Sequence, residues 1–253
     1  MQIYLAVAPR DYIKAGEHSA NLAMMAYKID PAGKLKSLPL NINSRGGIMV
    51  VDDSGCTAVG LDKTLPDQIT KECIQRGYQG VLLDFENLKP AEVRDVLAAL
   101  AMQLMAKKVT LYAAAEFADC SPVIGVVVSG AVSGGSYREY LAEQCAKHGA
   151  GRIALDLERV CTDFIMPSQD GAGKNLSPEE FAQISGAQLP FYSKELCANY
   201  FSHRASDGTA HFVLFDDANT LKEKLNVAQG LGINTAIMLY PEVLDIIDSF
   251  DLI

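Results

Sequence analysis

The sequence predicts a single closed (β/α)8 barrel that spans residues 1–253. Short apolar runs, typical of strands buried on both faces, alternate with helical patterns along the chain, and this alternation favours a parallel sheet. The length of 253 residues matches the roughly 250 residues that such a barrel takes. Because no strand is followed by a Gly-rich dinucleotide motif, an open doubly wound sheet is the weaker alternative.

The elements are expected in the following order. Strands are predicted at residues 3–8, 22–29, 48–51, 80–85, 109–115, 123–128, 153–157, 164–167, 212–215 and 235–240. Helices are predicted at residues 66–76, 90–107, 137–148, 178–185, 193–201, 220–231 and 241–250. Two of these helices begin with capping boxes, Ser136 with Glu139 and Ser177 with Glu180. Gly77, Gly149 and Gly232 follow periodic stretches as helix ends.

The composition excludes two classes of function. With 49% hydrophobic and 21% charged residues, the chain can bury the core of one domain. Its net charge of −9 argues against nucleic acid as a partner, since nucleic-acid binding needs a basic face. No apolar run approaches the roughly 18 residues of a membrane span.

Cysteine and histidine residues give no sign of a metal centre in the sequence. The six cysteines include no C-x-x-C pair and no histidine at zinc-like spacing, so we expect reduced thiols in a reducing compartment. The four histidines are scattered and form no recognisable catalytic or metal-binding set. No metal and no cofactor is therefore predicted.

The most informative segment is residues 80–87, Gly-Val-Leu-Leu-Asp-Phe-Glu-Asn. Side chains alternate along a strand, so Leu82, Asp84 and Glu86 should share one face. Two carboxylates at the end of a buried strand are costly unless they are paired, hydrogen-bonded or used. In parallel α/β proteins this end of a strand is also where active sites form. Asp84 and Glu86 are therefore the candidate catalytic pair, although helix capping and a salt bridge could also explain them.

Other acidic residues are weaker candidates. Glu116 follows the predicted fifth strand, and Asp216 and Asp217 follow residues 212–215, so they should lie on the same barrel face. We interpret Asp217 as the cap of the next helix. Asp156 and Glu158 form a rival pair, but the charges that follow them suggest a hairpin with surface or salt-bridged groups.

The segment Gly77–Asn87 reads G-Y-x-G-x-x-x-D-F-E-N and resembles glycoside hydrolase family 18, the chitinase-like barrels. In that family the fourth strand carries D-G-x-D-x-D-x-E; here Gly80, Asp84 and Glu86 match, whereas Gln79 and Leu82 replace the earlier acids. The form is most similar to the spore cortex and germination branch. Residues 211–224, followed by Gly230 to Asn234, resemble the seventh strand, seventh helix and eighth strand of the family.

This sequence differs from the family pattern at two positions that bind the sugar in the family. The sixth strand of the family ends in M-x-Y-D, and the matching residues here keep Met166 but place Ser168 where the tyrosine belongs. The eighth strand of the family presents a tryptophan, and this chain has none. Leu239 or Tyr240 takes that place, and Tyr240 could serve as the stacking surface.

The resemblance implies a substrate-assisted retaining hydrolase of N-acetylated glycans, such as peptidoglycan or chitin-like oligomers. Glu86 would protonate the glycosidic oxygen, and Asp84 would orient the acetamido group that attacks the anomeric carbon. Tyr240, Met166, Ser168, Glu116 and Asp216 would contact the substrate. The implied location is cytoplasmic or spore-associated, because the first residues lack the features of a signal peptide.

Two alternatives remain open. One is a carbohydrate-binding barrel of the same family that has lost turnover, as the missing tyrosine and tryptophan suggest. The other is a barrel enzyme of unrelated chemistry, such as a sugar-phosphate or metal-assisted reaction that uses Glu86, Glu116 and Asp216.

Overall fold

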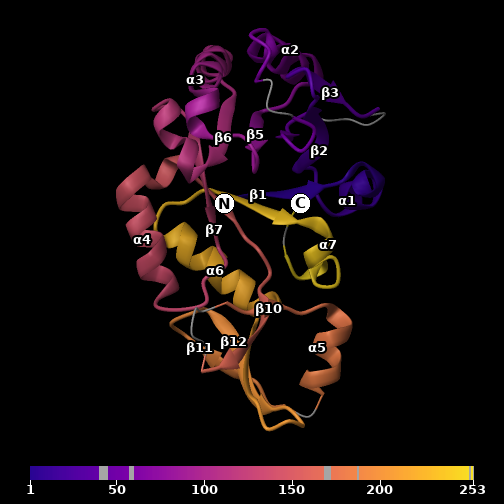
Figure 1. The fold of residues 1–253 in the computed structure, drawn as a ribbon, viewed down its shortest axis with the longest axis vertical. Coiled ribbons are helices and arrows are strands. Elements are labelled where there is room, and N and C mark those ends of the chain that lie inside the picture. Colours follow the sequence, from indigo (N-terminus) through magenta and orange to yellow (C-terminus); the bar gives the residue numbers. More distant parts are fainter. Residues whose placement is uncertain (40–44, 57–59, 168–171, 187, 251, 253) are drawn as a thin grey trace.

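Eight parallel strands close into a barrel, described in a computed structural model for residues 1–39, 45–56, 60–167, 172–186, 188–250 and 252 (Figure 1). In order around the barrel they are β1 (Gln2–Val7), β2 (Leu22–Ile29), β4 (Ile48–Asp52), β5 (Gly80–Asp84), β6 (Thr110–Ala114), β7 (Gly125–Ser129), β8 (Ile153–Asp156) and β14 (Thr235–Leu239). Strand β1 pairs in parallel with both β14 and β2, which closes the barrel. The predicted (β/α)8 barrel is confirmed, and β5 is its fourth strand.

Helices follow most of these strands. They are α1 (Tyr12–His18), α2 (Leu65–Arg76), α3 (Pro90–Ala106), α4 (Tyr137–His148), α6 (Ala218–Gly230) and α7 (Tyr240–Val243), with short 3-10 helices at Pro9–Asp11, Ala115–Cys120, Ala150–Arg152 and Ile247–Ser249. After β2 the chain adds the antiparallel strand β3 (Leu35–Ser37). None of the helices formed by the described residues is long and apolar enough to cross a membrane.

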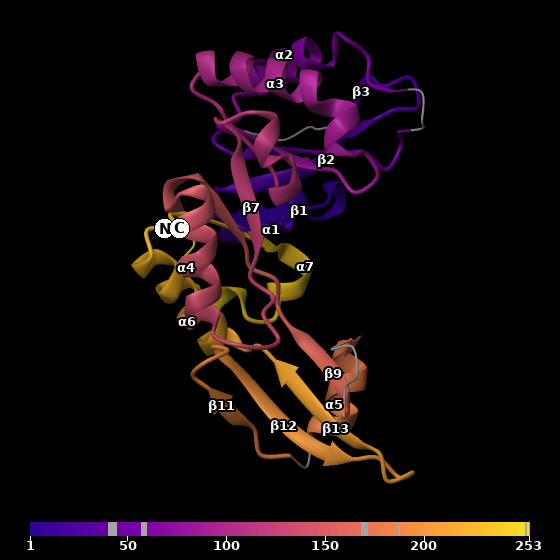
Figure 2. The same ribbon diagram turned by 60° about the vertical axis from the view of Figure 1, so that its left-hand side comes forward.

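A second, antiparallel sheet is inserted between β8 and α6 and extends from one end of the barrel (Figure 2). Its strands run in the spatial order β10 (Lys174–Asn175), β9 (Cys161–Met166), β13 (Ala210–Phe215), β12 (Ala198–Arg204) and β11 (Phe191–Ser193), and α5 (Pro178–Ser185) connects β10 to β11. We call residues 161–215 the inserted sheet.

The inserted sheet corrects three expectations. The strands predicted at 164–167 and 212–215 belong to it, so the sixth and seventh barrel strands are β7 and β8. The helix predicted at 193–201 is instead a turn followed by β12. In that turn Ser193 Oγ accepts a hydrogen bond from the Leu196 N–H, at 3.2 Å. Antiparallel pairing with β11 and β13 overrides the helix-forming residues 194–196 there.

The core has two layers, as alternation along the barrel strands requires. The large outer layer packs between barrel and helices and includes Val81 and Leu83 of β5. The smaller layer fills the barrel interior and includes Leu82 and Tyr112. Gly125 makes room for Tyr112, because a Cβ at Gly125 would lie 2.6 Å from the ring. One face of β5 thus points into the barrel and the other toward the helices.

A buried ion pair fixes the inserted sheet to the barrel. Asp216, directly after β13, receives hydrogen bonds from Lys224 Nζ of α6 at 2.7 Å, Thr220 Oγ1 at 2.9 Å and the Val160 N–H at 2.9 Å. Neither charged side chain is exposed to solvent. The Asp216 N–H also donates to the Val160 carbonyl, so the two ends of the inserted sheet meet.

Lys224→Met should strongly destabilise the protein, because it leaves the Asp216 carboxylate buried without its counter-charge. Loss of one partner of a buried pair typically costs about 3–5 kcal/mol. Urea unfolding followed by circular dichroism measures the change. Lys147→Met, at an exposed position of α4, is the matched control and should change the free energy of unfolding by less than about 0.5 kcal/mol. Equal effects of the two substitutions would contradict the prediction.

Candidate active site at the barrel mouth

Three barrel strands end in aspartates that belong to the inward-facing residue series. Asp52 ends β4, Asp84 ends β5 and Asp156 ends β8. Asp52 and Asp84 are direct neighbours in the strand register. Each follows by two positions a residue of the barrel interior, namely Val50, Leu82 and Ala154. All three therefore lie at the C-terminal mouth of the barrel, where active sites of this architecture form.

The position of Asp84 agrees with the strand pattern read from the sequence. Asp84 is exposed to solvent at the mouth of the barrel. Loss of hydration there raises the pKa of Asp84, and the charges of Glu86, Asp52 and Asp53 raise it further. Asp84 and Glu86 are thus close enough to interact electrostatically. Glu86 is exposed and lies two residues beyond the end of β5.

Asp53 holds the loop that carries Glu86. This residue follows β4 and is only 2% exposed. Its carboxylate accepts hydrogen bonds from the N–H groups of Glu86 at 3.1 Å, Asn87 at 2.9 Å and Leu88 at 2.7 Å. The Asn87 side-chain amide donates a fourth bond, at 2.9 Å. Burial opposes ionisation of Asp53, but these four bonds outweigh it and lower its pKa.

Sequence reasoning missed Asp53 and Asp52 as part of this site. The available signal was the same as at Asp84, because the apolar run 48–51 also ends in acids. What the sequence could not show is that Asp53 turns toward a loop more than thirty residues away, at Glu86 to Leu88.

Asp156 faces the same mouth from the seventh barrel strand, so the expected surface hairpin is wrong. Burial raises the pKa of Asp156 to about 7, and the charges of Glu158, Glu242 and Asp84 contribute further. Glu158, two residues beyond the strand like Glu86, accepts a hydrogen bond from Ser129 Oγ at 2.6 Å. The segments 83–86 and 155–158 therefore repeat one arrangement on two strands.

A groove of about 1030 Å³ lies between the inserted sheet and the segment formed by α7 and the residues that follow it. Glu158, Arg159 and Glu242 line its barrel side, and Phe164, Phe181 and Phe215 line the side of the inserted sheet. Asp84 and Glu86 are not among its lining residues. Two of its lining residues, Glu158 and Glu242, carry charges that act on Asp156 at the mouth.

The other predicted acidic residues lie in different places. Glu116 is exposed in the 3-10 helix that follows β6, at the mouth side of the barrel as expected. Asp216 does not end a barrel strand, because β13 belongs to the inserted sheet, and its carboxylate is enclosed by Lys224, Thr220 and the Val160 N–H. Asp217 caps α6 as predicted, accepting hydrogen bonds from the Asn219 and Thr220 N–H groups.

Tyr240 and Met166, two of the predicted sugar-contacting residues, are not presented by barrel strands. Tyr240 is only 2% exposed and packs in the outer core, so it offers no open ring face for stacking. Met166 is exposed at the end of β9, in the inserted sheet rather than on a barrel strand. Ser168 lies outside the described residues. The true sixth barrel strand, β7, ends in Ser129 and is followed by Gly130.

The mouth is strongly acidic. Among the described residues, the ion pairs include none that neutralises Asp52, Asp84, Glu86, Asp156 or Glu158. The described mouth carboxylates also do not converge as three potential metal ligands. A neutral ligand with hydrogen-bonding groups suits such a surface better than an anionic one.

The comparisons with known proteins show the fold. No protein-family model matches the sequence, and no curated protein matches it. The solved structures it resembles include the spore cortex-lytic enzyme SleL of Bacillus cereus, with a TM-score of 0.68 and 16% identity over 98% of this chain and 74% of that one. A family 18 N-acetylglucosaminidase of Paenibacillus barengoltzii has a TM-score of 0.67 and 11% identity, covering 98% of this chain and 99% of the other.

A chitinase of Chromobacterium violaceum is also similar, with a TM-score of 0.65 and 14% identity over 94% of this chain and 93% of that one. Because the first two matches cover 98% of this chain, they include the inserted sheet as well as the barrel. The chain therefore has a barrel fold similar to that of a spore cortex-lytic enzyme, a family 18 N-acetylglucosaminidase and a chitinase.

Asp53→Asn should destabilise the protein at neutral pH, because an amide cannot accept all four hydrogen bonds. We expect a loss of about 1–3 kcal/mol. The lowered pKa of Asp53 gives this loss a pH dependence: the stabilisation is present above the unfolded pKa of about 3.9 and disappears as the pH falls through the folded value. Urea unfolding of both proteins from pH 7 to pH 3 should show the difference shrinking in acid. A constant difference would refute the assignment.

Asp156 should have the opposite pH dependence. In the folded protein the Asp156 carboxyl group keeps its proton up to about pH 7, whereas in the unfolded chain the same group loses it near pH 4. The contribution of Asp156 to the free energy of unfolding therefore falls as the pH rises between these values. Asp156→Asn removes this dependence and should gain stability relative to the wild type as the pH rises from 4 to 8. Urea midpoints of the two proteins at four pH values test this. Parallel curves would rule out a raised pKa.

Proposed function

We propose that this protein hydrolyses N-acetylated glycans, of the peptidoglycan or chitin type, by a substrate-assisted retaining mechanism. The observation that carries the proposal is the position of Asp84 and Glu86. Asp84 ends the fourth strand of a barrel similar in fold to SleL and to a family 18 N-acetylglucosaminidase, and Glu86 follows it in the D-x-E spacing of family 18. Spore-associated action fits the likeness to spore cortex-lytic enzymes.

In this mechanism the acetamido oxygen of the substrate attacks the anomeric carbon, so the protein supplies no carboxylate nucleophile. Glu86 donates its proton to the glycosidic oxygen as the bond to the leaving sugar breaks. Asp84 accepts a hydrogen bond from the acetamido nitrogen and stabilises the positive charge that develops there. Water then opens the cyclic intermediate, and Glu86 takes back a proton.

The environment of each group supports its role. Four hydrogen bonds to Asp53 order the loop of Glu86, which keeps the acid in place while its side chain remains exposed. The pKa of Asp84 is raised by its surroundings, so a cation forming beside it would favour the ionised carboxylate. The acidic mouth suits neutral sugars and disfavours the sugar-phosphate chemistry considered above.

A second candidate function is glycan binding without turnover. It is favoured by the burial of Tyr240 and by the end of β7, where Ser129 and Gly130 provide neither the tyrosine nor the aspartate of the family pattern. Fewer contacts to the acetamido group would weaken both binding and the alignment of the attacking oxygen.

Glu86→Gln should lower the rate of hydrolysis of peptidoglycan fragments and N-acetylglucosamine oligomers by about 10²–10⁴-fold, because general acid catalysis contributes that much. Asp84→Asn should also lower it, through the acetamido group. Chromatography of reducing-end products gives the rates. Glu143→Gln, at an exposed position of α4, is the matched control and should retain full activity.

Two other outcomes would change the assignment. Wild-type hydrolysis that survives Glu86→Gln would exclude Glu86 as the acid. If the wild type binds the oligomers in calorimetry but releases no product, the binding function replaces the hydrolase.

A further inference from the structure

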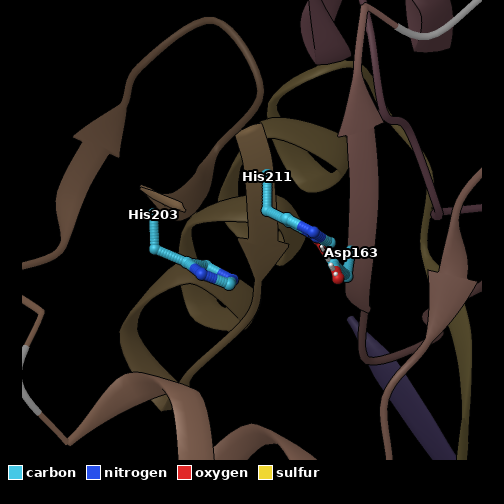
Figure 3. Close-up of side chains that lie close together, drawn as sticks. All are labelled: Asp163, His203 and His211. Carbon is cyan, nitrogen blue, oxygen red and sulfur yellow. Dashed lines mark hydrogen bonds and ion pairs between the residues drawn. The ribbon is translucent and has the colours of Figure 1, made fainter. Parts of the chain in front are cut away.

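Three potential metal ligands meet on the inserted sheet, away from the barrel mouth. Asp163 lies on β9, His211 on β13 and His203 on β12, which are adjacent strands (Figure 3). His203 stands directly opposite His211 in the strand register. Asp163 is opposite Val213, two positions from His211, and therefore reaches His211 diagonally on the same face. The register of three strands thus brings together residues up to 48 positions apart.

The side chains are already close. His211 Nδ1 lies 2.8 Å from one carboxylate oxygen of Asp163 and 3.0 Å from the other. The rings of His203 and His211 are stacked, with centroids 4.8 Å apart and planes at 15°. One ligand atom from each of the three residues lies within 4.8 Å of the other two. All three residues are partly buried.

His203 has an unsatisfied nitrogen at this position. Its Nε2 is buried and has no hydrogen-bond partner among the described residues. A buried polar atom without a partner is unfavourable, and such atoms in a folded protein call for an explanation. A bound cation would supply the missing partner. The contact between Asp163 and His211 does not by itself provide a partner for His203 Nε2.

The chemistry of the set is that of a transition-metal site. Two imidazoles and one carboxylate are the protein ligands of many zinc sites, in which water takes the fourth position. Ligand atoms about 2.0–2.1 Å from a tetrahedral zinc ion are separated by roughly 3.3 Å. The three ligand atoms, which already lie within 4.8 Å of one another, would move closer together on binding one ion. Calcium and magnesium prefer ligand sets made only of oxygen atoms, whereas two of the three ligands in this cluster are imidazole nitrogens.

We propose that Asp163, His203 and His211 bind a divalent transition-metal ion, with Zn²⁺ as the best match to two imidazoles and one carboxylate. The ion would join β9, β13 and β12 at the end of the sheet that is farther from the barrel, beyond the aromatic cluster of Phe181, Phe201 and Phe215. None of the three ligands lines the groove. The site is therefore separate from the proposed glycan chemistry and would stabilise the inserted sheet.

Metal titration of the full chain tests the proposal. Purified metal-free protein is titrated with Zn²⁺ in competition with a chromophoric chelator, and Co²⁺ is used as a spectroscopic probe of the ligands. The wild type should bind one Zn²⁺ per chain and unfold at a higher temperature with the ion present. The Co²⁺ complex should show visible bands without the near-ultraviolet charge-transfer absorption of thiolate ligands, which separates this site from the six free cysteines.

His203→Ala and Asp163→Asn should each weaken Zn²⁺ binding by at least tenfold, since even partners outside the first ligand shell contribute about 10–100-fold. Asp163→Asn keeps the shape of the side chain, so it reports on the ligand if His203→Ala fails to fold. His18→Ala is the matched control, because His18 lies on α1 beside Asp248. No binding by the wild type, or unchanged affinity in both ligand variants, would overturn the proposal.

Discussion

Closure of the barrel through β1 is the constraint on which the site depends. The first strand pairs in parallel with the last barrel strand over Gln2–Ala6 and also with β2. Because all eight strands run in the same direction, their carboxyl ends form one mouth. The register then decides which side chains enter it, and a slip of one residue would turn Asp52, Asp84 and Asp156 away from the interior. Closure thus gathers carboxylates from strands that are far apart in the sequence.

The gathered charges define the chemistry of the mouth. Reduced hydration is the main cause of the raised pKa of both Asp84 and Asp156; the charge of Asp52 adds to the shift of Asp84, and the charge of Asp84 adds to that of Asp156. The pKa of Asp84 and that of Asp156 therefore rise together, while Asp53, which receives four hydrogen bonds, shifts in the opposite direction. Carboxyl groups with different proton affinities thereby belong to one end of the barrel.

Much of the barrel could be predicted from the sequence, and so could α5 and parts of β9 and β13, whereas the pairing of these strands into a separate inserted sheet could not. Strands such as β5 and β8 are continuous apolar runs, and this pattern follows from burial on both faces. The strand β12, Ala-Asn-Tyr-Phe-Ser-His-Arg, is half polar and follows helix-forming residues, so only its pairing with β13 defines it. Asp84 could be found because its signal lies within one strand. Asp53, the burial of Tyr240 and the meeting of His203 with Asp163 depend on contacts between distant segments.

The junction at Val160 and Asp216 has an evolutionary consequence. The chain leaves the barrel and returns to it at two residues that are hydrogen-bonded to each other, at 2.8 and 2.9 Å. A segment whose two ends adjoin disturbs the barrel little, because it replaces only a short connection between β8 and α6. The entropic cost of closing such a segment grows only slowly with its length. Lineages of this barrel could therefore enlarge, shorten or exchange the segment as a cassette while the strand ends that carry Asp84 and Asp156 keep their positions.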